Sequence, residues 1–234
     1  MNIIAIFSGR FHPFHIGHKA TYDHLARRYG AGNVFVASTN TTAPLTSPFP
    51  FEEKRQMMIA LGVPKNRIVQ VKSPYKADEI TSHLDSSKTA LVFAVSEKDA
   101  TRFSFHKKDG SPAYMQPMSD KIELQPLANH AYVEIAPTVP FKVQGQEVIS
   151  ASAIRQLYIS SDQVGREQII TDLYGSYLPK IKQIFDRRLA LTEAAHVIMD
   201  AHRYSLSESA RPKVGKWAKI ILESEKAIEA EYRI

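Results

Sequence analysis

Short runs of apolar, β-branched residues recur along the chain as far as residue 135, and segments with a helical pattern separate them. Runs of this length with few polar residues are typical of strands that are buried on both faces, as in a parallel sheet. Their alternation with helices favours a doubly wound α/β domain with right-handed crossovers. We expect a five-stranded parallel sheet, with strands at residues 3–7, 34–37, 68–71, 90–95 and 132–135.

Helical patterns occupy the gaps between these runs, at residues 17–29, 51–61 and 78–84. The second helix carries Glu52 and Glu53 in its first turn, where acidic side chains interact favourably with the helix dipole, and Gly62 supplies a stop signal. Ligands of doubly wound sheets bind outside the carboxyl ends of the strands. Residues that directly follow a strand are therefore the first candidates for a functional site.

Two regions depart from the alternating pattern. Residues 101–125 carry turn residues, mixed charges and little periodicity, which predicts a long irregular insertion of open purpose. Residues 144–146 predict a turn, and a new helix is expected to begin at Ser150. The last segment is rich in Ala, Glu, Lys and Leu, so we predict a main domain at 1–190 and a helical C-terminal extension at 191–234.

The composition excludes several classes of protein. The 234 residues include no cysteine, which excludes disulfides, thiolate metal sites and a cysteine nucleophile. No apolar run approaches the roughly 20 residues that cross a bilayer, and the first residues lack the basic region of a signal peptide. We expect a cytoplasmic protein without a membrane partner.

The chain is basic, with a formal net charge of +6 and a pI near 9.4. The Lys and Arg residues are spread along the sequence without a polybasic block. Binding of small phosphates explains this surplus as well as nucleic acid would, and a solvated surface would also explain it. Nucleic acid is not the expected partner.

The first predicted strand leads directly into a motif that a helix follows, Ser8-Gly9-Arg10-Phe11-His12-Pro13-Phe14-His15-Ile16-Gly17-His18. Glycine at position 9 lets backbone amides approach a phosphate closely. His15 and His18 bracket Gly17 at the start of the helix, where the helix dipole favours an anion. Imidazole N–H groups placed there can stabilise the charge that builds on a phosphate during displacement.

The string Gly-Arg-Phe-x-Pro-Phe-His-x-Gly-His resembles the signature of the nucleotidylyltransferase superfamily. It resembles most the archaeal-type nicotinamide mononucleotide adenylyltransferases, and it lacks the Phe-Asp that typically precedes His-x-Gly-His in cytidylyltransferases. The resemblance implies a Rossmann-like fold. It also implies that His15 and His18 are catalytic and that the nucleotide is bound by Ser8, Gly9, Arg10, Phe11 and Gly17.

A second motif, Ile149-Ser150-Ala151-Ser152-Ala153-Ile154-Arg155, is similar to the superfamily's Ile-Ser-x-Thr/Ser-x-x-Arg. Ser150 is placed as an N-cap, and Ser152 lies in the first turn beside free backbone amides, so both are nucleotide-binding candidates. Arg155 can reach a β- or γ-phosphate with its forked donors and is a catalytic candidate. Taken alone, the motif is also consistent with an ordinary capped helix and a surface arginine.

Three weaker candidates concern the acceptor. Arg55 lies in a Pro-Phe…Glu-Arg…Met stretch similar to one whose arginine contacts substrate phosphate in the adenylyltransferases, although a solvated helix face explains it equally well. Asn40 closes the second strand, and Asp99 follows the fourth, where either side chain could meet the acceptor or simply order a loop. No spacing of residues predicts a protein metal site.

The reaction that the resemblance implies is attack by an acceptor phosphate on the α-phosphate of a nucleoside triphosphate, with release of pyrophosphate. Mg²⁺ is expected with the triphosphate. ATP and nicotinamide mononucleotide, giving NAD, are the preferred partners. CTP, or a phosphorylated alcohol, sugar or pantetheine, remains an alternative, as does a catalytically inactive nucleotide-binding or structural protein. The sequence leaves the acceptor and any homo-oligomer open.

Overall fold

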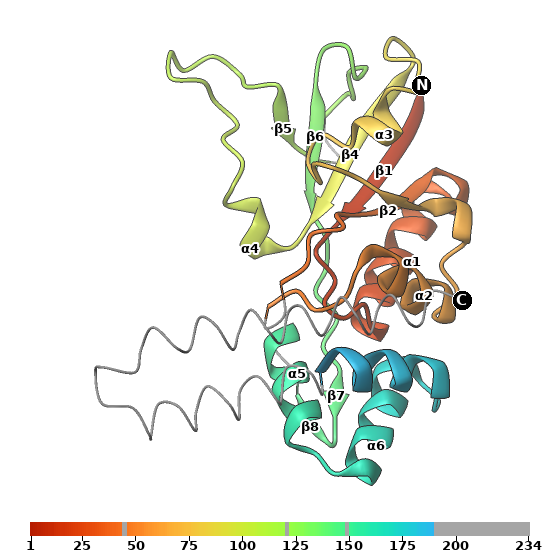
Figure 1. Cartoon of the computed structure of the whole chain (residues 1–234). Coiled ribbons are helices and arrows are strands. Elements are labelled where there is room, and N and C mark those ends of the chain that lie inside the picture. The colour runs from red at the N-terminus through yellow and green to blue at the C-terminus, as the bar shows by residue number, and fades with distance from the viewer. Residues whose placement is uncertain (44–45, 120–121, 148–149, 190–234) are drawn as a thin grey trace, which may run out of the picture. The chain divides into compact units, whose positions relative to one another are not determined.

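The computed structural model describes residues 1–43, 46–119, 122–147 and 150–189 (Figure 1). The chain divides into two compact units, Met1–Lys182 and Gln183–Ile234. In the second unit, the structure describes residues 183–189, which are helical. The predicted C-terminal extension at 191–234 lies outside the described residues, so it stays a prediction.

Six parallel strands form one sheet in the order β3-β2-β1-β4-β6-β5 (Figure 1). The strand order reverses between β1 and β4, which pair in parallel with each other. The other neighbour of β1 is β2, on one side, and the other neighbour of β4 is β6, on the opposite side. This confirms the doubly wound α/β fold. The strands are β1 (Asn2–Ser8), β2 (Val34–Ser38), β3 (Ile68–Gln70), β4 (Thr89–Val95), β5 (Met115–Pro117) and β6 (Ala131–Ile135).

The predicted count of five strands was one too low. The sixth strand, β5, lies within residues 101–125, which the sequence predicted as irregular, and it pairs in parallel with β6 at the edge of the sheet. Its three residues end in Pro117, and a strand of that length is too short to show a period. Proline is tolerated here because an edge strand leaves one row of N–H groups unpaired.

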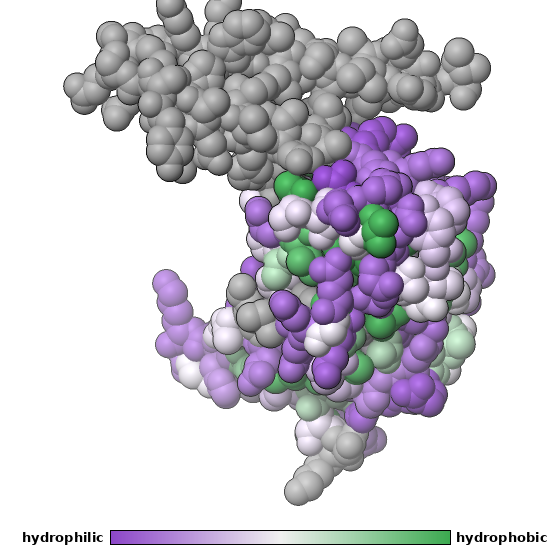
Figure 2. Space-filling model, turned by 90° about the horizontal axis from the view of Figure 1, so that it is seen from below, coloured by the Kyte–Doolittle hydropathy of each residue, from purple (hydrophilic) through white to green (hydrophobic). Residues whose placement is uncertain are grey.

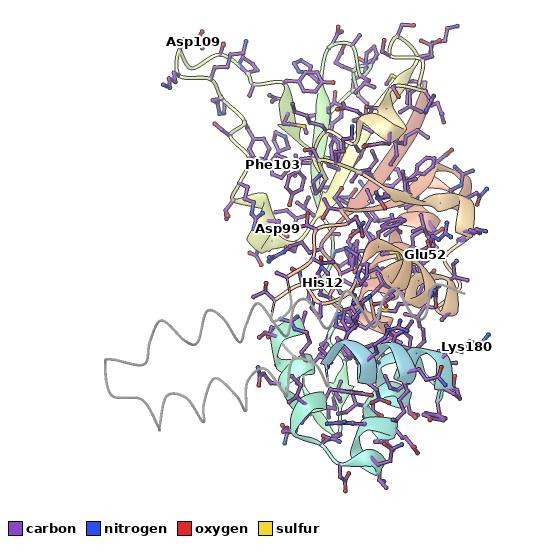
Figure 3. The ribbon with its side chains drawn as sticks, viewed as in Figure 1. His12, Glu52, Asp99, Phe103, Asp109 and Lys180 are labelled. Carbon is purple, nitrogen blue, oxygen red and sulfur yellow. The ribbon has the colours of Figure 1, made fainter. Side chains whose placement is uncertain are left out.

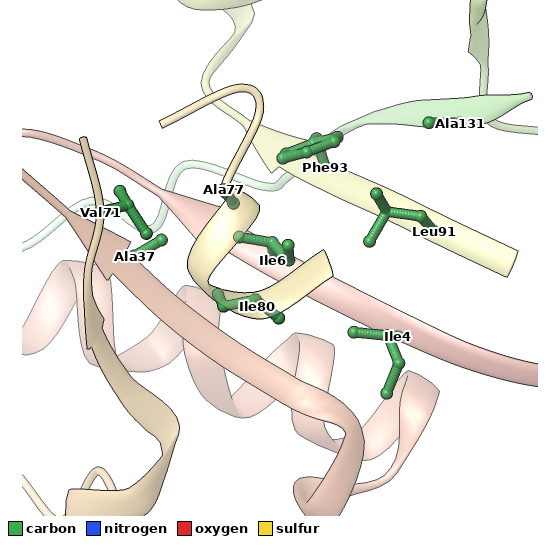
Figure 4. Close-up of a cluster of buried hydrophobic side chains, with 9 residues drawn as sticks. All are labelled: Ile4, Ile6, Ala37, Val71, Ala77, Ile80, Leu91, Phe93 and Ala131. Carbon is green, nitrogen blue, oxygen red and sulfur yellow. The ribbon is translucent and has the colours of Figure 1, made fainter. Parts of the chain in front are cut away.

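The two central strands form the core. All seven residues of β4 are buried, as expected for a strand that is covered on both faces. Ile4 and Ile6 of β1 lie beside Leu91 and Phe93 of β4 on one face, because alternate residues of a strand share a face (Figure 4). The members of this cluster are Ile4, Ile6, Ala37, Val71, Ala77, Ile80, Leu91, Phe93 and Ala131.

Helices flank the sheet. The short helix α3 (Asp78–Thr81) packs on the face of Ile4 and Ile6, and α1 (Ile16–Tyr29) contacts β1 and β2 from the other face (Figure 4). The remaining helices are α2 (Phe51–Ala60), α4 (Glu97–Ala100), α5 (Ala151–Ser160) and α6 (Gln163–Tyr174), with 3-10 turns η1 (Ala31–Asn33) and η2 (Lys65–Arg67). Helical backbone also occupies residues 179–189.

A β-hairpin precedes α5. Strand β7 (Lys142–Val143) pairs antiparallel with β8 (Gln146–Glu147), and Gln144 and Gly145 between them have φ angles of 51° and 77°. Two successive left-handed residues are the geometry of a two-residue hairpin turn. This confirms the turn that the sequence predicted at residues 144–146.

The described surface gives no sign of a membrane-spanning element. No described helix combines the length and the apolar composition that a bilayer span requires. Figure 2 shows hydrophilic side chains over most of the described surface on its face, with apolar side chains scattered among them. Scattered apolar side chains of this kind are normal on a folded protein.

Candidate active site

A cavity of about 610 Å³ opens at the carboxyl ends of β1, β4 and β6. It lies at the point where the strand order reverses, which is where ligands bind in doubly wound sheets. Three parts of the chain form it, namely the loop from β1 into α1, the start of α4, and residues 136–141 and 147 together with the first turn of α5. The lining includes nine predicted site residues, Ser8, Gly9, Arg10, Phe11, His15, Gly17, His18, Asp99 and Ser150.

His15 caps the N-terminus of α1. Its Nδ1 accepts a hydrogen bond from the backbone N–H of Gly17 at 3.2 Å, so the neutral ring carries its proton on Nε2. Burial holds the pKa of His15 well below its usual value, and the neighbouring His18 lowers it further. His15 therefore offers a neutral Nε2–H donor at the positive end of a helix.

His18 lies one turn further along α1, and its ring centroid is 3.8 Å from that of His15. The rings of Phe7, Phe11 and Phe14 surround it, with centroids 6.4, 5.0 and 5.3 Å away. Burial lowers its pKa to about 4. Its Nδ1 is buried without a hydrogen-bond partner in the described part of the chain, and a buried lone pair is tolerated better than a buried unpaired N–H. We therefore assign the proton of His18 to Nε2.

The two histidines thus present two neutral N–H donors side by side. The sequence predicted charge-assisted hydrogen bonds to phosphate. Because the lowered pKa values leave both rings neutral at neutral pH, the charged partner in such a bond is the phosphate. An anion in the cavity would raise both pKa values, because it favours the protonated rings.

Phe11 packs against the aromatic rings around His18. It has a left-handed φ of 51°, and its ring makes edge contacts with Phe7, Phe14 and His18 at centroid distances of 5.3, 5.2 and 5.0 Å. Gly9 makes this position accessible, since a Cβ at residue 9 would lie 2.5 Å from Cζ of Phe11. Phe11 was predicted to bind nucleotide. It does line the cavity, and its ring packs against His18 and two of the phenylalanines around His18.

Replacing Gly9 with alanine should displace the Phe11 ring and loosen the packing around His18. We expect the free energy of unfolding to fall by about 1–3 kcal/mol, the usual cost of overpacking a buried site. Chemical denaturation measures this loss. Gly32→Ala is the matched control, because its Cβ would meet its nearest atom only at 3.9 Å. Equal stability of the two variants would show that the Gly9–Phe11 contact does not constrain the loop.

The second motif begins α5 as predicted. Ser150 is the N-cap, and its hydroxyl accepts a hydrogen bond from the N–H of Ala153 at 3.1 Å. Ser152 lies in the first turn, exposed and outside the cavity lining. Ile149 lies outside the described residues. Ser150 and Ala151 bring the amino end of α5 to the cavity, so a second helix terminus faces the first motif's ligand space.

Arg155 does not line the cavity. Its side chain is buried, and Nη1 donates a hydrogen bond to the backbone oxygen of His12 at 2.7 Å. Burial is the main cause that lowers its pKa, and the positive charge of Arg10 adds to the effect. The predicted contact of Arg155 with a triphosphate therefore stays a prediction, and in this structure the side chain connects the second motif to the first.

Comparison with known proteins identifies the family. Residues 6–157 match the family model described as cytidylyltransferase-like. The chain belongs to this family of nucleotidylyltransferases. No curated protein sequence matches the chain.

Solved structures are similar to this chain at low sequence identity. A bifunctional NMN adenylyltransferase/ADP ribose pyrophosphatase from Francisella tularensis is 14% identical with a TM-score of 0.52, over 89% of this chain and 58% of that one. The Plasmodium falciparum nicotinic acid mononucleotide adenylyltransferase complexed with NaAD is 14% identical with a TM-score of 0.46, over 80% of this chain and 95% of that one. The chain thus spans a little over half the length of the Francisella protein.

The predicted acceptor residues take different positions in this nucleotidylyltransferase. Arg55 lies outside the cavity lining and pairs with Glu52 on the same helix, with Nη2 to Oε1 at 2.8 Å. Asn40 also lies outside the lining, and its Oδ1 accepts from the N–H of Phe51 at 2.7 Å at the start of α2. The structure therefore gives both side chains a local structural contact. Neither is brought to the histidines.

Asp99 is the predicted acceptor residue that does line the cavity. It lies on α4 at the base of the segment that extends towards Asp109 (Figure 3). Its carboxylate accepts from the Ser96 hydroxyl at 3.0 Å and pairs with Arg102 at 3.2 Å. Asp99 is thus held at the cavity by Ser96, the N-cap of α4, and by Arg102, which follows the helix.

Phe141 is a cavity residue that sequence reasoning missed. Its ring centroid lies 4.4 Å from that of His15, and a Cβ at Gly17 would lie 3.0 Å from its Cδ1. Thr21 of α1 donates to the oxygen of Pro137 at 3.1 Å, which helps to hold this segment against α1. The available signal was the apolar, proline-flanked stretch directly after the fifth predicted strand, where a parallel sheet places its ligands.

Proposed function

We propose that this nucleotidylyltransferase transfers AMP from ATP to nicotinamide mononucleotide, forming NAD and releasing pyrophosphate. The observation that carries the proposal is the pair of neutral histidine donors, His15 and His18, at the start of α1 inside a cavity at the sheet's switch point. Helix N-termini with free amides and N–H side chains are suited to bind phosphate groups.

In the proposed reaction, a phosphate oxygen of the acceptor forms a bond to the α-phosphorus of ATP. The bond from that phosphorus to the oxygen bridging to the β-phosphate breaks, and pyrophosphate leaves with the electron pair. The acceptor phosphate is already ionised, so no general base is required. The Nε2–H groups of His15 and His18 would stabilise the charge on the transferring phosphate, and alignment supplies the rest of the acceleration.

Arg10 has the place and charge to hold the leaving phosphates. It is exposed on the loop between β1 and α1 and lines the cavity. Ser8, Gly9 and Gly17 line the same cavity and bring backbone close to the ligand space. We assign nucleotide binding to these residues within the proposal.

Mg²⁺ is part of the proposal. Within the described ranges, no three His, Cys, Asp or Glu side chains are placed to hold a metal ion together. The cavity carboxylates are Asp99 and Glu147. This donor set fits an ion that arrives with the triphosphate and takes most of its ligands from phosphate oxygens and water, as Mg²⁺ commonly does. Bound there, it would neutralise charge on the leaving pyrophosphate.

Two observations support ATP and a mononucleotide acceptor. The Gly9-Arg10-Phe11 string resembles that of archaeal-type nicotinamide mononucleotide adenylyltransferases. The Francisella neighbour with a TM-score of 0.52 is named for the same activity. CTP with a phosphorylated alcohol or sugar is the second candidate, because the matching family model is described as cytidylyltransferase-like.

A pyrophosphate-release screen tests the proposal. The protein is supplied with ATP or CTP and Mg²⁺ against a panel of phosphorylated acceptors, with nicotinamide mononucleotide first. We expect ATP with nicotinamide mononucleotide to give the highest rate. Reaction of another pair in its place would reject the proposed substrates and keep the reaction class. Nucleotide binding without pyrophosphate release from any pair would favour an inactive nucleotide-binding protein.

A further inference from the structure

Two buried cations donate hydrogen bonds to the backbone of the loop between β1 and α1. Lys54 of α2 has no exposed surface, and Arg155 of α5 is 7% exposed. Lys54 donates from Nζ to the backbone oxygen of Arg10 at 3.1 Å, and Arg155 donates to that of His12 at 2.7 Å. These two carbonyls flank Phe11, whose φ is left-handed. The cations thus fix the backbone on both sides of a strained residue.

Lys54 uses all three of its N–H donors. Besides Arg10, its Nζ contacts the hydroxyl of Ser38 at 2.8 Å and the backbone oxygen of Thr39 at 2.6 Å. Ser38 in turn donates to the oxygen of Arg10 at 3.4 Å. Lys54 therefore connects the carboxyl end of β2 with the loop that follows β1, directly beside the cavity-lining residue Arg10.

Among the residues that the structure describes, no carboxylate pairs with the charge of Lys54. In the part of the chain that the structure describes, the hydrogen-bond partners of Lys54 and Arg155 are neutral oxygens. Its neighbour Arg55 shows the contrast, since it pairs with Glu52. Burial lowers the pKa of His12 to about 3, and the positive charges of Lys54, Arg155 and Arg10 add to the effect. Three positive charges therefore gather around one loop and one neutral histidine.

Such a cluster is costly in a free protein. A buried charge without an opposite charge lowers stability, and a second positive charge close to it lowers stability further. A polyanion in the adjoining cavity supplies the missing negative charge. The cluster is therefore explained by a ligand with several phosphates better than by the fold alone.

We propose that Lys54 is a positioning residue for polyphosphate, which fixes the backbone of Arg10 and supplies a buried positive charge without touching the ligand. The inference rests on the proposed function, because it concerns the same cavity. It predicts that the contribution of Lys54 to binding affinity increases with the number of phosphates on the ligand. A monophosphate should depend on Lys54 much less than a triphosphate does.

The test compares Lys54→Met with Lys88→Met. Lys88 is the matched control, because its side chain is 81% exposed and it directly precedes the amino end of β4, whereas the cavity lies at the carboxyl ends of the strands. Calorimetric titration at pH 7 measures affinity for inorganic triphosphate, ATP and AMP. We expect Lys54→Met to bind inorganic triphosphate and ATP about tenfold more weakly or worse, which corresponds to about 1.4 kcal/mol. Its affinity for AMP should change less than threefold, and Lys88→Met should match the wild type.

The ratio of ATP affinity to AMP affinity is the readout that general damage to the fold would not change. An unchanged ratio in Lys54→Met would overturn the inference. Lys54→Gln keeps side-chain donors and removes the charge, so it carries the test if the methionine variant does not fold, with the same expected loss and the same contrary result. A wild-type protein that binds neither ATP, CTP nor inorganic triphosphate would reject the proposed function and this inference together.

Discussion

Replacing His18 with alanine is expected to lower the rate constant for pyrophosphate release by about 100- to 1000-fold. Removal of a single donor to a charge that develops in the transition state commonly costs this much. His18 is suited to that role because its ring is caged by phenylalanines and its neutral Nε2–H is the donor left for the cavity. Steady-state kinetics with the active substrate pair measure the loss.

The matched control is His24→Ala. His24 lies on the same helix as His18 and outside the cavity lining, so its replacement tests whether loss of any α1 histidine damages the enzyme. We expect kcat of His24→Ala within about twofold of the wild type, and KM of His18→Ala to change far less than kcat. A His18→Ala protein with full turnover would remove the histidine pair from the mechanism.

Lowering the pH from 7 to 5 is expected to reduce the free energy of unfolding of the ligand-free protein by about 4 kcal/mol through His12 and His18 together. Both are buried, and burial lowers their pKa values to about 3 and about 4 from an unfolded value of 6.5. Between pH 6.5 and pH 4 the unfolded chain binds these protons and the folded chain does not, so stability falls as the pH falls. His15 adds to the effect in the same direction.

Denaturant unfolding at pH 7 and pH 5 measures this loss. His12→Asn should lose about 2 kcal/mol less than the wild type over the same interval, since one buried neutral histidine is gone. The asparagine oxygen can accept the hydrogen bond that Nδ1 of His12 accepts from Phe49. His83→Asn, at an exposed position, should keep the wild-type sensitivity. Equal sensitivity in His12→Asn and His83→Asn would contradict the buried neutral state of His12.

The sequence was sufficient for most of the sheet and for the first motif. Runs such as residues 90–95 are buried on both faces, and this environment leaves a direct mark as continuous apolar residues. The order strand, glycine turn, histidines and helix is local, so it could be found without a structure. The strand β5 left no such mark, because three residues at an edge need not be apolar.

Long-range contacts explain what the sequence could not predict. The choice between Lys54 and Arg55 depends on which of two adjacent cations faces the sheet, and the rotation of α2 is set by packing rather than by composition. Arg155 belongs to the second motif, yet its hydrogen-bond partner is the backbone oxygen of His12, 143 positions away. Phe141 reaches His15 across the fold in the same way. No local pattern encodes such pairs.

The fate of the α-phosphate tests the central claim most directly. ATP labelled with ³²P at the α- or at the γ-position is supplied with the acceptor that reacts in the screen, and the products are separated. The account predicts that the α-label enters the acceptor product and that the γ-label leaves as pyrophosphate. Both the labelling of the product and the release of pyrophosphate should be suppressed in His18→Ala. Transfer of the γ-label to the acceptor, or release of the α-label only as free nucleotide, would contradict nucleotidylyl transfer at this site.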